Sequence, residues 1–309
     1  MNTVLFSHVA CLDHDTGFGH PESPARLKAV LSALEDEKFH FLQRREAPRA
    51  SPEQLARAHP GGYVERILAA VPAEGHADLD SDTVLSPGSG EAALRAAGAV
   101  VAAVDAVCTG EARNAFCAVR PPGHHAEADR PMGFCLFNNI AVGAWHARAV
   151  HGIQRIAVID FDVHHGNGTQ DIFESDPGLF YASLHQWPLY PGTGAADERG
   201  DHGNVVNAPL PAMAGSPEFR HAVSTLVLPA LEQFAPGLVM ISAGFDAHVR
   251  DPLAGLHLVE ADYAWITRKL AQVARQHCQG RIVSVLEGGY DLHALAASCA
   301  VHVEELMQA

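Results

Sequence analysis

Residues 155–170 read RIAVIDFDVHHGNGTQ, and this stretch decides the fold that we expect. Its first part, 156–159, is a short apolar run, typical of a strand buried on both faces of a parallel sheet. Directly after the run come Asp160, Asp162, His164 and His165, followed by two glycines within three residues. The stretch therefore predicts a buried strand that ends at a functional site.

The polar residues of this stretch suggest a metal site. In an extended segment successive side chains point to opposite sides, so Asp160, Asp162 and His164 share one face. Two carboxylates and an imidazole suit a divalent metal with mixed nitrogen and oxygen ligands, zinc foremost. Alternatively, the aspartates cap a turn and the histidines are satisfied polar groups. Three such groups are costly to bury without partners, which favours the metal.

Strand-like and helical patterns alternate along the rest of the chain. We expect strands at 3–7, 115–119, 155–160, 179–183, 205–210, 237–242 and 281–286. We expect helices that begin at Pro24 and Pro52, and helices at 88–107, 139–150, 217–233, 260–277 and 292–307. This order predicts an α/β protein: a single-domain, three-layer αβα fold with a mostly parallel central sheet. No linker or change in composition interrupts it, so we expect one domain over residues 1–309.

Composition narrows the class of protein. The 309 residues are 48% hydrophobic, and 36 acidic against 21 basic residues give a net charge of −15. This charge opposes direct binding to nucleic acid and favours small or cationic partners. The six cysteines form no CxxC pair, which indicates a reducing compartment. The chain lacks a signal-peptide pattern and an apolar run of the ~20 residues that a membrane span needs. We expect a cytoplasmic protein that does not bind membranes; its oligomeric state is left open.

Other unusual clusters follow the predicted strands at 120–125, 183–185, 243–248 and 287–290. Ligands of open α/β sheets bind outside the carboxyl ends of the strands, so these clusters should converge. The adjacent His124 and His125 could be two metal ligands, two surface residues or a proton-transfer pair. Asp246 is a candidate third metal ligand or an ordinary loop aspartate. Tyr290, after two glycines, could reach a substrate oxygen or pack on the surface.

Five motifs stand in a fixed order along the chain: RPPGHHA (120–126), GFCLFNN (133–139), DFDVHHGNGTQ (160–170), AGFDAH (243–248) and EGGY (287–290). Together with His20-Pro21-Glu22, they resemble the zinc-dependent histone deacetylase family, including its bacterial amidohydrolases and acetylpolyamine amidohydrolases. The asparagine at position 167 resembles the class II branch and the bacterial members, since class I proteins usually have an aspartate at this position. The resemblance implies an arginase/deacetylase-like fold and zinc-dependent hydrolysis of N-acyl amides, foremost deacetylation of acetyl-lysine or a similar acylated amine.

The resemblance also implies roles for individual residues. The zinc ligands would be Asp162, His164 and Asp246. His125 would be the general base for the attacking water, and His124 its electrostatic partner or the proton donor to the leaving amine. Asp160 and Asn167 would orient these histidines. Tyr290 would donate a hydrogen bond to the carbonyl oxygen and complete an oxyanion site with zinc.

A narrow substrate channel is implied as well, with the residues Gly133, Phe134, Tyr190, Leu253, Asp82 and Thr83. Phe134 and Tyr190 would be its walls, although family members commonly have phenylalanine where Tyr190 stands. Asp82 and Thr83 lie on a loop that often contacts the substrate backbone, or else form a solvated turn. Leu253 follows an Asp-Pro pair, where one polyamine-specific branch has an acidic gatekeeper. A leucine there favours a lysine-like amine over a polyamine.

By the same matching, a potassium ion would bind at Asp160, Asp162, His164, Ser183 and Leu184, mostly through backbone oxygens. Ser183 and Leu184 could equally be plain strand residues. Three other functions compete with the acyl-lysine deacetylase: an acetylpolyamine deacetylase, a catalytically silent module that binds acylated ligands, and a manganese ureohydrolase. The complete motif set speaks against the silent module, and the single D-x-H pattern speaks against a two-metal site.

Overall fold

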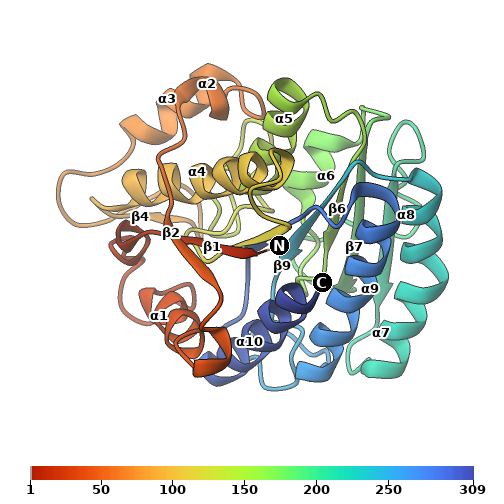
Figure 1. Cartoon of the computed structure of the whole chain (residues 1–309). Helices are drawn as coiled ribbons and strands as arrows, with labels where there is room; N and C mark the ends of the chain where they lie inside the picture. Colours follow the sequence, from red (N-terminus) through yellow and green to blue (C-terminus); the bar gives the residue numbers. More distant parts are fainter. Residues whose placement is uncertain (1) are drawn as a thin grey trace.

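An eight-stranded sheet runs through the middle of the computed structural model, which describes residues 2–309 (Figure 1). The strand order is β2-β1-β5-β10-β9-β6-β7-β8, and every neighbouring pair is parallel. The strands are β1 (Thr3–Ser7), β2 (Gln43–Glu46), β5 (Asn114–Cys117), β6 (Ile156–Asp160), β7 (Leu179–Gln186), β8 (Val205–Leu210), β9 (Leu238–Ala243) and β10 (Ile282–Leu286). The expected fold class, a single-domain α/β fold with a parallel sheet, is confirmed.

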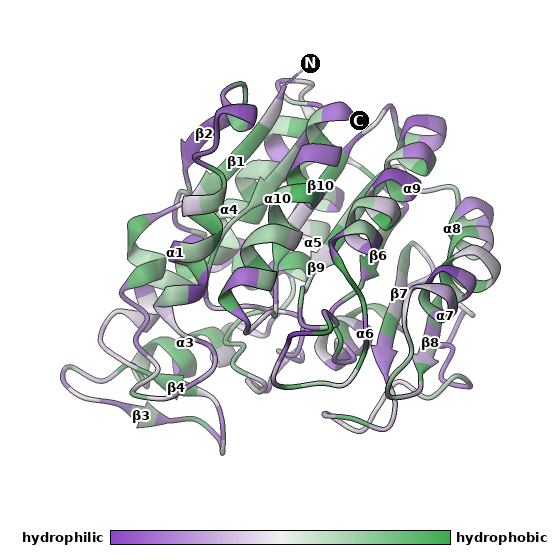
Figure 2. Ribbon diagram, turned by 90° about the horizontal axis from the view of Figure 1, so that it is seen from below, coloured by the Kyte–Doolittle hydropathy of each residue, from purple (hydrophilic) through white to green (hydrophobic). Residues whose placement is uncertain are grey.

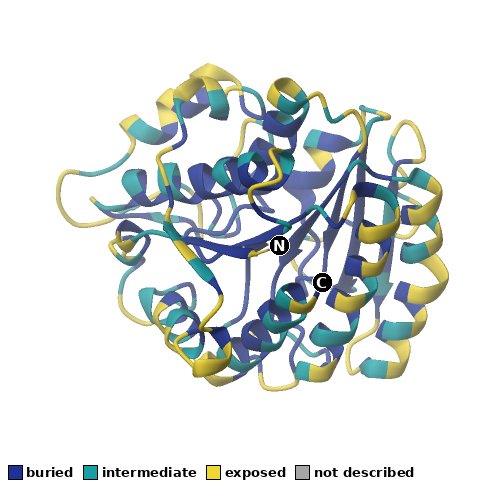
Figure 3. Ribbon diagram, in the orientation of Figure 1, coloured by how far each residue is buried: buried dark blue, intermediate teal, exposed yellow. Residues whose placement is uncertain are grey.

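Helices cover both faces of the sheet and bury its strands (Figures 1 and 3). One layer contains α4 (Ser89–Cys108), α5 (Asn139–His151) and α6 (Asn167–Phe173), with α2 (Pro52–Leu55) and α3 (Gly61–Ala69) outside them. The other contains α1 (Pro24–Ala33), α10 (Leu292–Gln308), α9 (Glu260–Cys278), α7 (Ser216–Ala222) and α8 (Leu228–Phe234). The hydropathy colouring in Figure 2 shows apolar residues concentrated on the central strands and polar residues on the outer helices. This is the pattern that a doubly covered parallel sheet requires.

Several elements differ from the sequence prediction: the helices α3 and α6 and the short strands β3 and β4 were not predicted, and two further differences have a clear physical reason. β2 was not predicted, because its residues Gln43–Glu46 are polar and alternate between half-buried and exposed at the edge of the sheet. Charged residues on edge strands prevent further strand pairing, and they leave no apolar pattern to detect. The predicted helix 217–233 is interrupted by a π-helical segment, Val223–Val227, between α7 and α8. Pro229, which has no N–H to donate, lies just after this segment and accounts for the irregular turn.

The topology places the predicted clusters at one edge of the sheet. Because all strands are parallel, the loops that follow β5, β6, β7, β9 and β10 leave from the same side. β10, the last strand in the sequence, lies between β5 and β9 in the middle of the sheet. The described residues include a small antiparallel pair, β3 (Ala77–Asp78) and β4 (Val84–Leu85), and no helix among them is long and apolar enough to cross a membrane.

Candidate active site

Asp162, His164 and Asp246 converge at the carboxyl ends of β6 and β9. Nδ1 of His164 lies 3.2 Å from Oδ1 of Asp162 and 3.1 Å from Oδ2 of Asp246. All three side chains are buried, and one ligand atom from each lies within 4.8 Å of the others. Backbone N–H groups orient the carboxylates: Gly288 donates to Asp162 across 2.8 Å, and Val163 donates to Asp246 across 2.8 Å. The structure thus brings together residues that are 84 positions apart in the sequence.

This donor set fits a divalent cation. Burial and the neighbouring charge of Asp162 raise the pKa of Asp246 to about 7. A bound cation would offset this repulsion between the two carboxylates. Gly244 and Gly288 let the backbone pack closely against the carboxylates, since a Cβ at either position would collide with Asp162 or Asp246. Two carboxylates and one imidazole are a ligand set that zinc accepts, with room for a further ligand from the channel.

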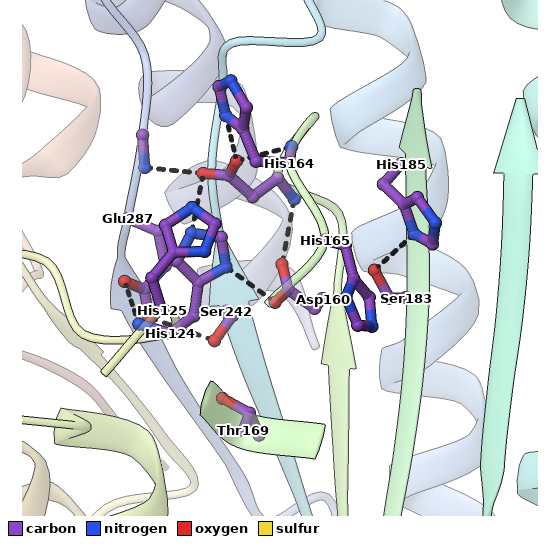
Figure 4. A network of polar contacts seen from close by, with 12 residues as sticks. His124, His125, Asp160, His164, His165, Thr169, Ser183, His185, Ser242 and Glu287 are labelled. Atoms are coloured by element: carbon purple, nitrogen blue, oxygen red, sulfur yellow. Dashed lines mark hydrogen bonds and ion pairs between the residues drawn. The ribbon is translucent and has the colours of Figure 1, made fainter. Parts of the chain in front are cut away.

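The two adjacent histidines occupy different environments (Figure 4). Nδ1 of His124 contacts Oδ2 of Asp160 at 2.9 Å. Nδ1 of His125 contacts Oδ1 of Asn167 at 2.8 Å. Their rings are 4.0 Å apart, and both residues line the channel described below. Asp160 also accepts a hydrogen bond from the hydroxyl of Tyr181 on β7, at 3.0 Å. Each histidine is therefore held by its own oxygen partner.

These partners give the histidines opposite charge states. Burial lowers the pKa of His124, but the carboxylates of Asp160 and Asp162 outweigh it and raise the pKa to about 10. Burial lowers the pKa of His125 well below 6.5, and the charges of His124 and His164 lower it further. The site therefore pairs a protonated imidazole with a neutral one, which suits one group to donate a proton and the other to accept one.

A channel of about 200 Å³ leads from the surface to these residues. It is lined by Asp82, Pro122, His124, His125, Gly133, Phe134, His164, Leu189, Tyr190, Leu253, Gly288 and Tyr290. Of the predicted channel residues, only Thr83 is absent from this set. It is buried beneath the rim, where its hydroxyl accepts a hydrogen bond from the N–H of Phe134 at 3.2 Å. Pro122, Leu189 and Gly288 are lining residues that the sequence did not reveal.

The wall residue Phe134 has an unusual backbone. Its φ of +68° lies in the left-handed region, which bulky side chains rarely adopt. The preceding Gly133 has φ +57°, and a Cβ there would lie 2.5 Å from the ring of His125. Strain of this kind persists where the surrounding contacts fix it. The ring centroid of Phe134 lies 4.8 Å from that of His20 and 6.1 Å from that of Tyr290.

The turn that carries Tyr290 is fixed by a buried arginine. Arg26 on α1 donates from Nε to the carbonyl of Gly289 at 2.6 Å and from Nη2 to that of Glu287 at 2.5 Å. Its Cζ atom lies 4.9 Å from the ring centroid of Tyr290, and Glu22 balances its charge at 2.9 Å. Desolvation raises the pKa of Tyr290 well above 10, so the phenol keeps its proton. Sequence reasoning missed Arg26, because it lies on a predicted core helix.

The loop that carries Tyr190, residues 187–204, is anchored beside the candidate metal ligands. Glu198 accepts from the N–H groups of Gly194 and Ala195 at 3.1 and 3.0 Å. The ring of His165 contacts Thr193 Oγ1 at 2.8 Å, and that of His185 contacts the carbonyl of Gly194 at 2.9 Å. His165 thus joins this channel wall to the segment that carries His164.

Two further groups lie outside the channel. Ser183, in the proposed potassium set, contacts Nδ1 of His185 at 2.9 Å, and Leu184 is buried in β7 (Figure 4). Asp105 on α4 contacts His146 and His151 on α5 at 2.7 and 2.6 Å. Arg57 donates to the other nitrogen of His146 at 2.6 Å, so both ring nitrogens of His146 have partners and the trio is a hydrogen-bonded tie between helices.

Comparisons with known proteins agree with this geometry. Residues 20–306 match the family profile described as "Histone deacetylase domain". The chain is 43% identical over 292 residues to the histone deacetylase-like amidohydrolase of Pseudomonas aeruginosa, a match that covers 93% of this chain and 76% of that protein. It is 38% identical over 321 residues to chloroplastic histone deacetylase 14 of Arabidopsis thaliana, covering 96% and 75%. The crystal structure of the HDA15 HD domain matches with a TM-score of 0.94 and 35% identity, over 99% of this chain and 88% of that one.

Proposed function

Because this chain belongs to the histone deacetylase family and is a hydrolase of acyl amides, we propose that its substrate is an acylated lysine side chain. The observation that carries this choice is the rim of the channel. Leu253 lines the entrance and is 36% exposed, at the position where an acidic side chain would select a second cationic amine. A leucine gives such an amine no counter-charge, whereas it can contact the apolar part of an acylated side chain.

We propose that Asp162, His164 and Asp246 hold a zinc ion. Zinc bound there supplies a Lewis acid that lowers the pKa of water and polarises the amide carbonyl. The clustered ligand atoms and the buried, mutually repelling carboxylates support this assignment.

The roles of the other residues follow from their environments. His125 is neutral and held through Nδ1, so Nε2 can accept the proton of the attacking water. His124, which Asp160 keeps protonated, stabilises the developing negative charge and donates a proton to the leaving amine. The hydroxyl of Tyr290 donates a hydrogen bond to the carbonyl oxygen as it becomes an oxyanion. Phe134 and Tyr190 hold the acyl-bearing chain between them.

Four further assignments belong to this proposal. Potassium would bind at Asp160, Asp162, His164, Ser183 and Leu184, and Asp82 would contact the substrate backbone. Residues 1–309 would act as one catalytic domain. The cytoplasm is the proposed compartment, supported by six cysteines that are all free in the structure.

The substrate is tested by measuring kcat/KM for an acetyl-lysine peptide and for an acetylated polyamine with the zinc-loaded protein. We expect a clear preference for the peptide. A preference for the polyamine would contradict the proposal and would mean that an acidic group other than residue 253 selects the substrate. Binding of both ligands without turnover would instead support the silent module.

A further inference from the structure

Asp251 lies at the base of the channel rim and does not itself line the channel. It belongs to the loop between β9 and α9, five residues after Asp246, and its side chain is largely buried. Its own N–H donates to the carbonyl of His248 at 2.8 Å, which closes a tight turn and fixes the position of the carboxylate.

The two oxygens of this carboxylate bind the backbones of two channel residues. Oδ2 accepts a hydrogen bond from the N–H of Tyr290 at 2.7 Å, and Oδ1 accepts one from the N–H of Leu253 at 3.0 Å. Hydrogen bonds to an ionised carboxylate are about twice as strong as neutral ones. One side chain thus ties the turn 287–290 to the rim of the channel.

The turn needs such a tie, because its own backbone is permissive. Gly289 has φ +124°, a conformation essentially restricted to glycine, and two consecutive glycines precede Tyr290. Arg26 holds the carbonyls of Glu287 and Gly289 from the α1 side, while Asp251 holds the N–H of Tyr290 from the opposite loop. Arg26 therefore fixes the chain that leads to Tyr290, and Asp251 fixes Tyr290 itself.

We infer that Asp251 is a positioning residue that aligns Tyr290 with the substrate carbonyl through its backbone N–H. The inference rests on the proposed role of Tyr290 as a hydrogen-bond donor. The hydroxyl must lie within a few tenths of an ångström of its productive position, and residues that orient an active group in this way contribute about 10- to 100-fold to activity.

The test is a double-mutant cycle of Asp251→Asn and Tyr290→Phe, with kcat and KM measured on an acetyl-lysine peptide. An asparagine has one acceptor oxygen, and its NH₂ group repels the second N–H, so one of the two backbone ties is lost. We expect D251N to lower kcat at least tenfold, with KM changed less than threefold and the zinc content per chain unchanged. In the Y290F background, D251N should lower kcat less than threefold further, because the hydroxyl that it aligns is absent.

The outcomes separate the two claims. A kcat near wild type in Y290F alone would overturn the proposed role of Tyr290. Where Y290F does lower kcat, two results would overturn the inference about Asp251. One is a D251N variant whose kcat falls less than tenfold. The other is a double variant whose kcat is threefold or more below that of Y290F. If D251N does not fold, D251S is measured by the same criteria, since serine has a single side-chain oxygen in place of the two carboxylate oxygens.

Arg250→Met is the matched control. Arg250 joins the same two loops on the outside, through an exposed contact of 3.5 Å with Asp291. Exposed ion pairs contribute little, and this one touches no backbone group of the turn. The kcat of Arg250→Met should stay within twofold of wild type. A loss comparable to that of D251N would show that loop stability in general controls the rate, which contradicts a specific role for Asp251.

Discussion

Asn167 Oδ1 lies 2.8 Å from Nδ1 of His125, and this contact fixes the tautomer of the imidazole. The amide group of Asn167 is oriented by Glu127, whose carboxylate accepts from Nδ2 at 2.8 Å. Its oxygen must therefore face His125 and accept a hydrogen bond from the N–H group at Nδ1. The lone pair of Nε2 is left for the channel, which is the arrangement that a general base needs.

Replacing Asn167 with aspartate should therefore move the pH dependence of turnover. The added carboxylate favours the protonated imidazole and raises the pKa of His125, so the neutral base is lost at a higher pH. We expect the acid limb of the kcat/KM profile to shift upward by about one pH unit. Asn167→Ala, which adds no charge, serves as the control. An unchanged acid limb in N167D would show that His125 does not control it.

Metal removal should abolish activity. Asp162, His164 and Asp246 are the proposed ligands, and chelation followed by dialysis should leave inactive protein that one equivalent of zinc restores. Asp246→Ala removes a ligand and a charge, so the affinity for zinc should fall by about 10- to 100-fold or more. The affinity is measured by competition with a chromophoric chelator. Full activity in protein verified to be metal-free would contradict the zinc assignment.

Leu253→Glu should make acetylated polyamines better substrates. The new carboxylate would lie at the rim and attract the second ammonium group of a polyamine, but it would be partly exposed and screened. We expect the ratio of kcat/KM for polyamine over peptide to rise about tenfold, which corresponds to about 1.4 kcal/mol. The rise should shrink at high salt. Leu253→Gln separates charge from polarity, and an equal rise in that variant would exclude the electrostatic explanation.

His302 on α10 should make folding sensitive to acid. Thr267 donates its hydroxyl proton to the carbonyl of Tyr263, so its oxygen accepts from Nδ1 of His302 at 2.6 Å, while Ser284 lies 2.8 Å from Nε2. Burial lowers the pKa of His302 to about 3, against about 6.5 in the unfolded chain. The unfolded state thus binds the extra proton as the pH falls through the window from about 6.5 to about 3, and stability is lost there.

This loss is measurable by urea unfolding at pH 6.5 and pH 5.5. His302 alone should account for about 1 kcal/mol of the decrease between these values. The decrease should be smaller by that amount in His302→Asn, even though the variant is less stable at both pH values. An identical decrease in the two proteins would mean that the pKa of His302 is the same in the folded and unfolded states.

The motif residues could be predicted because the topology brings them together. The motifs lie at or after the ends of buried strands, and the loops that follow parallel strands leave from the same end of the sheet. Motifs that are far apart in the sequence therefore converge on one site. Tyr181 and Asp251 could not be predicted, because each acts through a partner on another strand or loop. Arg26 reaches Gly289 across 263 positions, and only the folded chain shows that this arginine is buried. β2 was missed because an edge strand needs no apolar pattern.

The place of β10 in the middle of the sheet has a consequence for biosynthesis. A ribosome makes residues 282–286 after all other strands, yet they separate β2-β1-β5 from β9-β6-β7-β8. A nascent chain that stops before residue 282 holds two partial sheets with unpaired inner edges, which are prone to aggregation. Such a chain also lacks Glu287 and Tyr290. Insertion of the last strand therefore completes the sheet and the channel in one step, and a prematurely terminated product is recognisable to the cell's chaperones and proteases by its open strand edges.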